Sequence, residues 1–178
     1  MDETDRRLLL HSLRESQEVF QRALGGVTEA EAVWKPGADR WSILECTEHV
    51  AVAESGMFRG VRQGTPITEP GIADADREKR LCAAAADRTR KRSAPEPVRP
   101  SGRFASLAEA IAEFAERRER TIRWVESCPD DLRTVSMVHP VAGRITCHDC
   151  LWVIIAHPVR HAEQIREIRE AWRSAEVK

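Results

Sequence analysis

An α-helical bundle is the fold class that this 178-residue sequence predicts, and three observations carry the prediction. Four long stretches repeat apolar residues at the three- and four-residue spacing of a helix face. Three of these stretches begin with the residue pattern of a helix N-cap. No convincing set of strands competes with them. Because the length suits one well-buried core, we expect a single domain over residues 1–178.

The first long helix is predicted from about Asp5 to Leu24. Gly25-Gly26 follows it and supplies a residue that adopts positive φ at little cost, as helix ends often require. A short helical turn is then predicted over residues 28–31, before Lys35-Pro36-Gly37.

The other three long helices each start at a Ser or Thr with an acidic residue three positions later, which is the spacing of a capping box. The three pairs are Ser42 with Glu45, Ser106 with Glu109, and Thr146 with Asp149. The predicted ends are about Gln63, Cys128-Pro129 and Ser174.

Two connecting segments differ in character. Residues 66–101 are rich in Pro, Ala and Arg and predict a long crossover, in which residues 77–92 form either a further helix or a mobile excursion. Residues 133–145 are predicted to be extended, with a turn around Gly143.

The composition excludes several classes of protein. The net charge is −1, which gives no overall attraction to nucleic acid or to an anionic membrane. No apolar run approaches the roughly 18 residues of a membrane span, and the N-terminus lacks a signal-peptide pattern. Five cysteines are an odd number without framework spacing, so reduced thiols are expected. We therefore expect a soluble, cytoplasmic protein.

One segment is locally basic. Residues 77–103 contain nine basic and three acidic residues, a local charge of +6. This charge either attracts an anionic substrate across the crossover or, as is commoner, forms a solvated face. Nucleic-acid binding would call for interleaved aromatic residues, and only Phe104 lies nearby.

Histidines at helical spacing predict a metal site. His157 and His161 are four residues apart and fall on the stripe of the last helix that should face inward. Buried imidazoles are costly unless their ring nitrogens are satisfied, and a divalent metal satisfies them. His49 lies on the second long helix, so three corners of a tetrahedron are defined and the fourth stays open. The alternative is that these are hydrogen-bonded core histidines or surface histidines, which spacing alone does not separate.

The stripe of small residues beside His49 predicts space for a ligand. Ala53 and Gly56 follow His49 on that stripe and should leave a cavity that opens on the metal. Glu45 is a candidate to orient the His49 ring, although its place in the capping box competes with that role. Cys46 is either a thiolate ligand or a small buried residue, and Gln164 either a pocket hydrogen-bonding residue or a structural one.

Cys147-His-Asp-Cys150 at the start of the last helix has three interpretations. It is a redox motif, part of a second zinc site with His139 or His148, or two small core residues one turn apart. We favour the last, because no strand precedes the helix as in a thioredoxin-like motif.

Three stretches together resemble the DinB-like family. They are Val33-Trp-Lys-Pro36, Trp41-Ser-Ile-Leu-Glu-Cys-Thr-Glu-His49-Val, and His139-Pro-Val-Ala-Gly-Arg-Ile-Thr followed by Leu151-Trp-Val-Ile-Ile-Ala-His157-Pro-Val-Arg-His161-Ala-Glu-Gln-Ile165. The resemblance implies a DinB-like four-helix bundle with a long crossover connection, a metal site at one end and, often, a homodimer. It also implies that His49, His157 and His161 bind one divalent ion: Zn, Ni, Fe or Mn. Pro158 departs from a regular helix and puts the aim of the flanking histidines in question.

The family also implies the chemistry. Its members include transferases that use low-molecular-weight thiols such as bacillithiol or mycothiol, and others described as metal-dependent hydrolases. The sequence thus predicts a metal-dependent thiol transferase or hydrolase. The alternative from another class is a non-catalytic, metal-binding stress or interaction protein.

Overall fold

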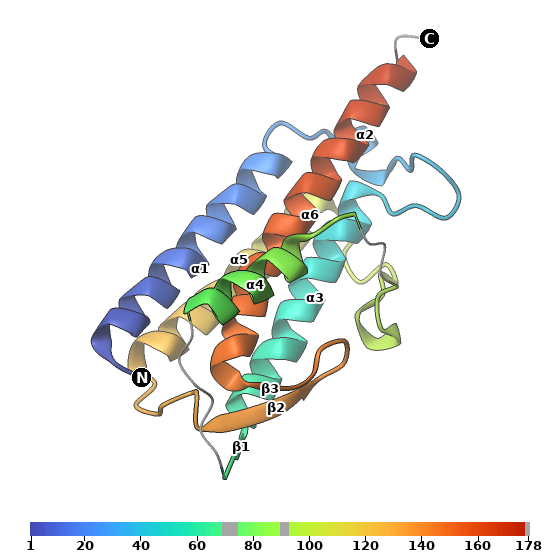
Figure 1. Cartoon of the computed structure of the whole chain (residues 1–178). Coiled ribbons are helices and arrows are strands. Elements are labelled where there is room, and N and C mark those ends of the chain that lie inside the picture. Colours follow the sequence, from blue (N-terminus) through green and yellow to red (C-terminus); the bar gives the residue numbers. More distant parts are fainter. Residues whose placement is uncertain (69–74, 90–92, 177–178) are drawn as a thin grey trace.

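The computed structural model describes residues 1–68, 75–89 and 93–176 of the chain. Four long helices form the bundle: α1 (Glu3–Leu24), α3 (Ile43–Arg62), α5 (Leu107–Ser127) and α6 (Cys147–Glu176). Helix α6 packs between α1 and α3, and α5 closes the bundle on the opposite side (Figure 1). The predicted four-helix bundle is therefore confirmed.

The three predicted N-cap residues form the capping hydrogen bonds at the starts of α3, α5 and α6. The hydroxyl of Ser42 accepts from the backbone N–H of Glu45, whose carboxylate accepts from the N–H of Ser42. Ser106 caps α5 in the same position, and Thr146 and Asp149 bond reciprocally at the start of α6. These contacts satisfy backbone donors that a helix start would otherwise leave unpaired.

The crossover between α3 and α5 contains β1 (Thr65–Pro66), α4 (Ala75–Ala86) and the short 3₁₀ helix η1 (Glu96–Val98). The sequence leaves residues 77–92 as either a helix or a mobile excursion, and the structure has a helix, over residues 75–86. This helix packs along α6. Part of the predicted range, residues 90–92, lies outside the described residues. A short helix, α2 (Glu29–Val33), connects α1 to α3.

The segment between α5 and α6 forms a hairpin of β2 (Val135–His139) and β3 (Gly143–Thr146). Met137 pairs with Ile145 and His139 with Gly143, whose φ of +71° accounts for the glycine at this turn. Strand β1 adds to the free edge of β2 in antiparallel register, so the sheet order is β1-β2-β3.

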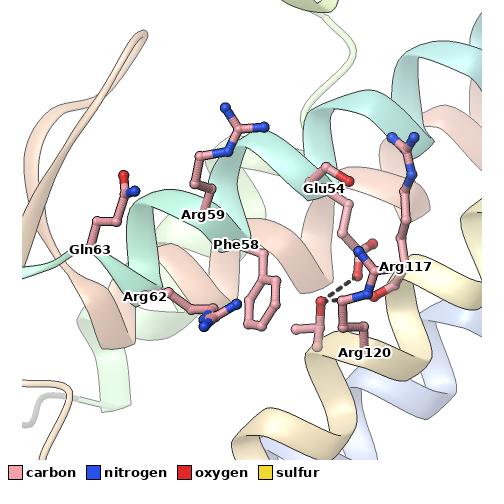
Figure 2. A pocket seen from close by; sticks show the side chains of 9 residues that line it. Glu54, Phe58, Arg59, Arg62, Gln63, Arg117 and Arg120 are labelled. Carbon is pink, nitrogen blue, oxygen red and sulfur yellow. Dashed lines mark hydrogen bonds between the residues drawn. The ribbon is translucent and has the colours of Figure 1, made fainter.

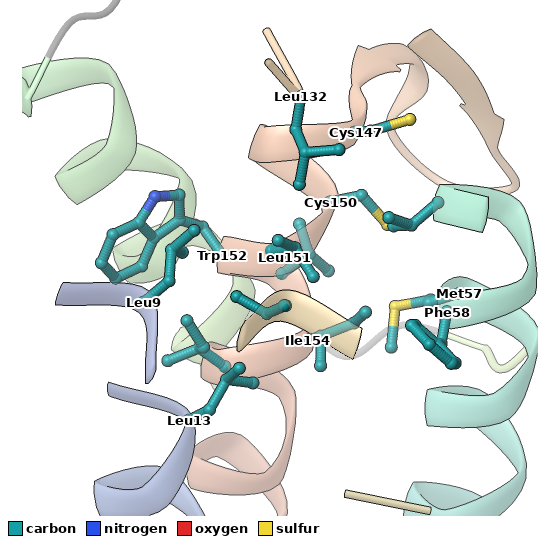
Figure 3. Close-up of a cluster of buried hydrophobic side chains, with 14 of the residues drawn as sticks. Leu9, Leu13, Met57, Phe58, Leu132, Cys147, Cys150, Leu151, Trp152 and Ile154 are labelled. Atoms are coloured by element: carbon teal, nitrogen blue, oxygen red, sulfur yellow. The ribbon is translucent and has the colours of Figure 1, made fainter. Parts of the chain in front are cut away.

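The core has two apolar clusters separated by a buried polar layer. The cluster nearer the hairpin includes Leu13, Met57 and Ile154 (Figure 3), and the other includes Phe20 and Phe114. Between them lies the layer, formed by Glu54 from α3, Arg118 from α5, and Ser16 and Thr121, all buried.

Arg118 is the centre of this layer. Its guanidinium donates to both oxygens of Glu54 at 2.8 Å, to the carbonyl of Leu13 at 2.7 Å and to the carbonyl of Ile154 at 3.2 Å. The arginine therefore links all four long helices at one level.

The contact with Ile154 also explains how α6 tolerates Pro158. Proline has no N–H, so the carbonyl four residues earlier, that of Ile154, loses its helical donor. Arg118 supplies a donor in its place, and α6 continues through Pro158 without a break.

Among the described residues, none of the helices is long and apolar enough to span a membrane.

Candidate metal centre

The structure brings His49, His157 and His161 together in the seam between α3 and α6. The capping box at Ser42 fixes where α3 begins and thereby places His49 two turns into the helix. His157 and His161 lie one turn apart on the face of α6 that meets α3. His49 and His161 are buried, whereas His157 is partly exposed. The cluster therefore reaches solvent on the side of His157.

The distances suit one cation. One ligand nitrogen from each histidine lies within 4.8 Å of the others, and the Nε2 atoms of His49 and His157 are 3.1 Å apart. Two nitrogens bound to one tetrahedral zinc at about 2.0–2.1 Å would be about 3.3 Å apart. The cluster thus needs only small side-chain adjustments to hold a metal.

The electrostatic environment keeps the three rings neutral. Burial lowers the pKa of His49 below its ordinary value, and burial together with the neighbouring rings and Arg160 lowers the pKa of His157 and His161 well below theirs. Neutral imidazole is the form that binds metals. The same burial that disfavours protonation therefore favours a metal.

The ring of His49 is oriented by the crossover. Its Nδ1 lies 2.8 Å from the carbonyl oxygen of Val98 in η1, so this nitrogen carries the proton and Nε2 presents its lone pair to the cluster. Next to His49, the buried carboxylate of Glu48 accepts from the backbone N–H groups of Ser101, Gly102 and Arg103. Glu48 thereby anchors the segment that carries Val98.

The ring of His161 is oriented from its own helix, α6, with support from Arg88 of the crossover. Its Nδ1 lies 3.0 Å from Oε1 of Gln164, which also accepts from Nη1 of Arg88 at 3.2 Å. Arg88 is held in turn by both oxygens of Glu167, at 3.0 and 2.6 Å. The chain Glu167–Arg88–Gln164–His161 thus fixes which nitrogen of His161 faces the cluster.

Two of the predicted neighbours lie elsewhere than expected. The Glu45 carboxylate accepts hydrogen bonds from the Ser42 N–H and from Lys35. It does not orient the His49 ring, which donates to the Val98 carbonyl. Cys46 is fully buried in the apolar cluster beyond the polar layer and is not part of the ligand group. Burial raises the pKa of the Cys46 thiol, which disfavours the thiolate form.

The stripe of small residues on α3 is used in three ways. Ala53 is buried in the core cluster nearer the hairpin. A methyl group added at Gly56 would meet no atom of the described chain within 4 Å, so this part of α3 is open. A methyl group at Gly60 would come within 2.4 Å of the Met137 side chain, so Gly60 is where the hairpin closes on α3.

Trp41 forms an aromatic wall beside the cluster. Its ring centroid is 4.9 Å from that of His49, and it stacks over His161 at 6.4 Å with an interplanar angle of 18°. This residue precedes the Ser42 cap, so the capping geometry also places the wall.

Cys147 and Cys150 are both fully buried, and burial raises the pKa of Cys147 to about 11 and that of Cys150 further. Strand β3 ends directly before α6, so the expectation that no strand precedes this helix is wrong. The raised thiol pKa values are nevertheless the opposite of what a redox motif requires. Within the described residues, His49, His157 and His161 are the one group of three potential ligands close enough to share an ion. The second zinc site is therefore not formed, and the two cysteines act as small core residues.

The basic crossover is largely neutralised where it is described. Arg88 pairs with Glu167, Arg99 with Glu96, and Arg103 with Glu48. The Arg88 and Arg103 pairs fasten the crossover to α6 and α3, whereas the pair of Arg99 with Glu96 lies within the crossover.

The chain is a four-helix bundle in which three histidines converge, and comparison with known proteins identifies its family. The chain belongs to the DinB superfamily, whose family profile matches residues 12–165. It is 27% identical over 150 residues to the uncharacterized protein YuaE of Bacillus subtilis strain 168, covering 83% of this chain and 88% of YuaE. Its fold is similar to that of YfiT from Bacillus subtilis, described as a probable metal-dependent hydrolase with an unusual four-helix bundle topology. That similarity has a TM-score of 0.63 at 15% identity and covers 96% of this chain and 89% of YfiT.

Sequence patterns did not indicate four of the residues that shape the site. Glu48, Val98 and Arg88 act through contacts across 49 to 76 positions of the chain, which periodicity does not reveal. Trp41 belongs to the quoted family motif, but the motif does not show that its ring lies against the ligands.

Proposed function

We propose that this protein is a metal-dependent enzyme of hydrolase or thiol-transferase type. His49, His157 and His161 would hold one divalent ion, and the fourth coordination position would receive the substrate. The observation that supports this best is the convergence of three neutral imidazoles, two of which have the outer nitrogen already hydrogen-bonded to Val98 or Gln164.

The divalent ion would act as a Lewis acid that activates water for hydrolysis or a thiol for transfer. The chain supplies the rest of the site. The Trp41 ring covers one side of His49 and His161 and limits the direction of approach. His157 is partly exposed, and Gly56 leaves α3 without a side chain at an exposed position, so we propose that a small-molecule substrate approaches over these residues. The fold of YfiT, described as a probable metal-dependent hydrolase, makes hydrolysis the first activity to test.

Metal analysis of untagged protein tests the binding step. We expect close to one Zn, Ni, Fe or Mn per chain, lost in His161→Ala and retained in His11→Ala. His11 is a matched control, because its side chain is 76% exposed on α1. Equal and low metal content in the wild type and in His161→Ala under metal-replete conditions would refute the site.

The reaction type is tested separately on the cobalt-substituted protein. Hydrolysis of activated esters or amides supports a hydrolase. A new sulfur-to-metal charge-transfer band with a low-molecular-weight thiol such as bacillithiol or mycothiol supports a transferase. If one metal is bound but neither result is obtained, the protein is better described as a non-catalytic, metal-binding stress or interaction protein.

A further inference from the structure

A hollow lies between α3 and α5, away from the histidine cluster. Its volume is about 340 Å³, which is within the range of small-molecule sites. Figure 2 shows the hollow from close by, with side chains from both helices around it. Its lining consists of Glu54, Ser55, Phe58, Arg59, Arg62, Gln63, Arg117, Arg120 and Thr121, and includes none of the three histidines.

The lining is strongly basic. Arg59 and Arg62 come from one turn of α3, and Arg117 and Arg120 from one turn of α5, so two pairs of guanidinium groups border one hollow. The one carboxylate in the lining, Glu54, is already bound on both oxygens by Arg118. It therefore contributes little free negative charge to the hollow.

The four arginines differ in how they are held. Arg117 and Arg120 pair with Glu113 and Glu116, one turn earlier on α5. Arg59 and Arg62 have no acidic partner within ion-pair distance in the part of the chain that the structure describes. The Arg62 guanidinium lies 6.0 Å from the centroid of the Phe58 ring, which holds it at the edge of the hollow.

Uncompensated guanidinium groups around a concave surface repel one another, and an anion relieves that repulsion. Guanidinium binds phosphate oxygens in a bidentate manner, which makes arginine the preferred residue for phosphate recognition. The hollow is larger than a phosphate ion, and Phe58, Ser55 and Gln63 offer one apolar surface and two polar side chains beside the arginines. The remainder of an organic molecule can occupy that space.

We propose that the hollow between α3 and α5 binds a phosphorylated small molecule, with Arg59 and Arg62 as the principal phosphate ligands. This site is separate from the histidine cluster and does not depend on the chemistry that occurs there.

Inorganic pyrophosphate is a suitable probe, with benzoate as a monoanionic carboxylate for comparison. Metal-free wild-type protein should bind pyrophosphate in calorimetric titrations, at least tenfold more tightly than benzoate. Arg59→Ala/Arg62→Ala should weaken pyrophosphate binding tenfold or more. The variant Arg7→Ala/Arg22→Ala removes the same charge from exposed positions of α1 and should bind as the wild type does.

Three outcomes would overturn the proposal. The first is no pyrophosphate binding by the wild type up to ~10 mM, which is about tenfold above the weak end of usual substrate affinities. The others are an unchanged affinity in Arg59→Ala/Arg62→Ala and an equal loss in the α1 control. Equal loss in the control would mean that overall charge attracts the anion. Because Arg59 and Arg62 are exposed, both double variants should keep the wild-type circular dichroism spectrum, which makes a loss of binding interpretable.

Discussion

The contact between Arg118 and the Ile154 carbonyl predicts that Arg118 and Pro158 are energetically coupled, although they lie on different helices. Replacing Arg118 with Met leaves Glu54, which is 2% exposed, as a buried carboxylate without its cation. Breaking one partner of a buried ion pair costs about 3–5 kcal/mol. The substitution also leaves the Ile154 carbonyl without a donor, because Pro158 cannot provide one. A buried carbonyl without a donor costs about 1–3 kcal/mol by itself.

Replacing Pro158 with Ala restores an N–H four residues after Ile154. In that background the helix itself can satisfy the carbonyl. The destabilisation caused by Arg118→Met should therefore be smaller than in the wild type, by at least about 1 kcal/mol. Urea unfolding of metal-free protein, followed by circular dichroism, measures the four free energies of this cycle.

Arg117→Met in the same two backgrounds is the matched control, since Arg117 contacts Glu113 and Ala51 and should show no coupling to Pro158. If the effects of Arg118→Met and Pro158→Ala add within about 0.5 kcal/mol, the explanation given for the tolerated proline is wrong.

Four other predictions follow from the site and its surroundings. Gln164→Leu removes the acceptor for His161 Nδ1 and should weaken metal binding about 10–100-fold in competition with a chelator. If both this variant and Arg88→Ala bind metal as tightly as the wild type, the chain of contacts is not needed. Acidification should destabilise the metal-free protein, because burial, with Arg133 nearby, lowers the pKa of His148 to about 4 from an ordinary value of 6.5. Between these pH values the unfolded chain carries a proton on His148 that the folded chain does not. His148 should therefore contribute at most about 3 kcal/mol to the fall in the free energy of unfolding as the pH is lowered, in addition to the contribution of the three clustered histidines, and His148→Gln should remove that part of the profile. Gly56→Leu should leave metal content unchanged and lower thiol binding or turnover tenfold or more; full activity would show that substrate does not approach over Gly56. Light scattering at high micromolar concentration should report a homodimer, and a monomer there would contradict the dimer expected from the family resemblance.

The capping signals made the long helices predictable. Ser42, Ser106 and Thr146 each form the hydrogen bonds that their spacing indicated, because an N-cap is a contact within three residues and local sequence is sufficient to specify it. The hairpin was anticipated only as an extended segment with a turn at Gly143, and its pairing with β1 was missed because two-residue strands carry no periodic signal.

The histidine cluster was predictable from helix periodicity together with the family motif. Its surroundings were not, because they depend on how the crossover folds back. Glu45 lies four residues before His49, but the capping box and Lys35 engage its carboxylate, and a carbonyl 49 residues away orients the ring. Pro158 looked like a defect in α6 because its compensation comes from α5, through a buried arginine that has no sequence signature.

The wide spacing of the ligands along the chain affects the order of events in the cell. His49 and His157 are 108 residues apart, and the Val98 carbonyl that orients His49 is 49 residues from it. No two helices adjacent in the chain can assemble the cluster, so a ribosome-bound chain lacking α6 has only one of the three imidazoles. Closing a chain segment of this length costs conformational entropy, and the contacts also require the last helix to have been synthesised. A cation held by all three histidines would therefore be taken up only after α6 has docked on α3, from the ions available at that point.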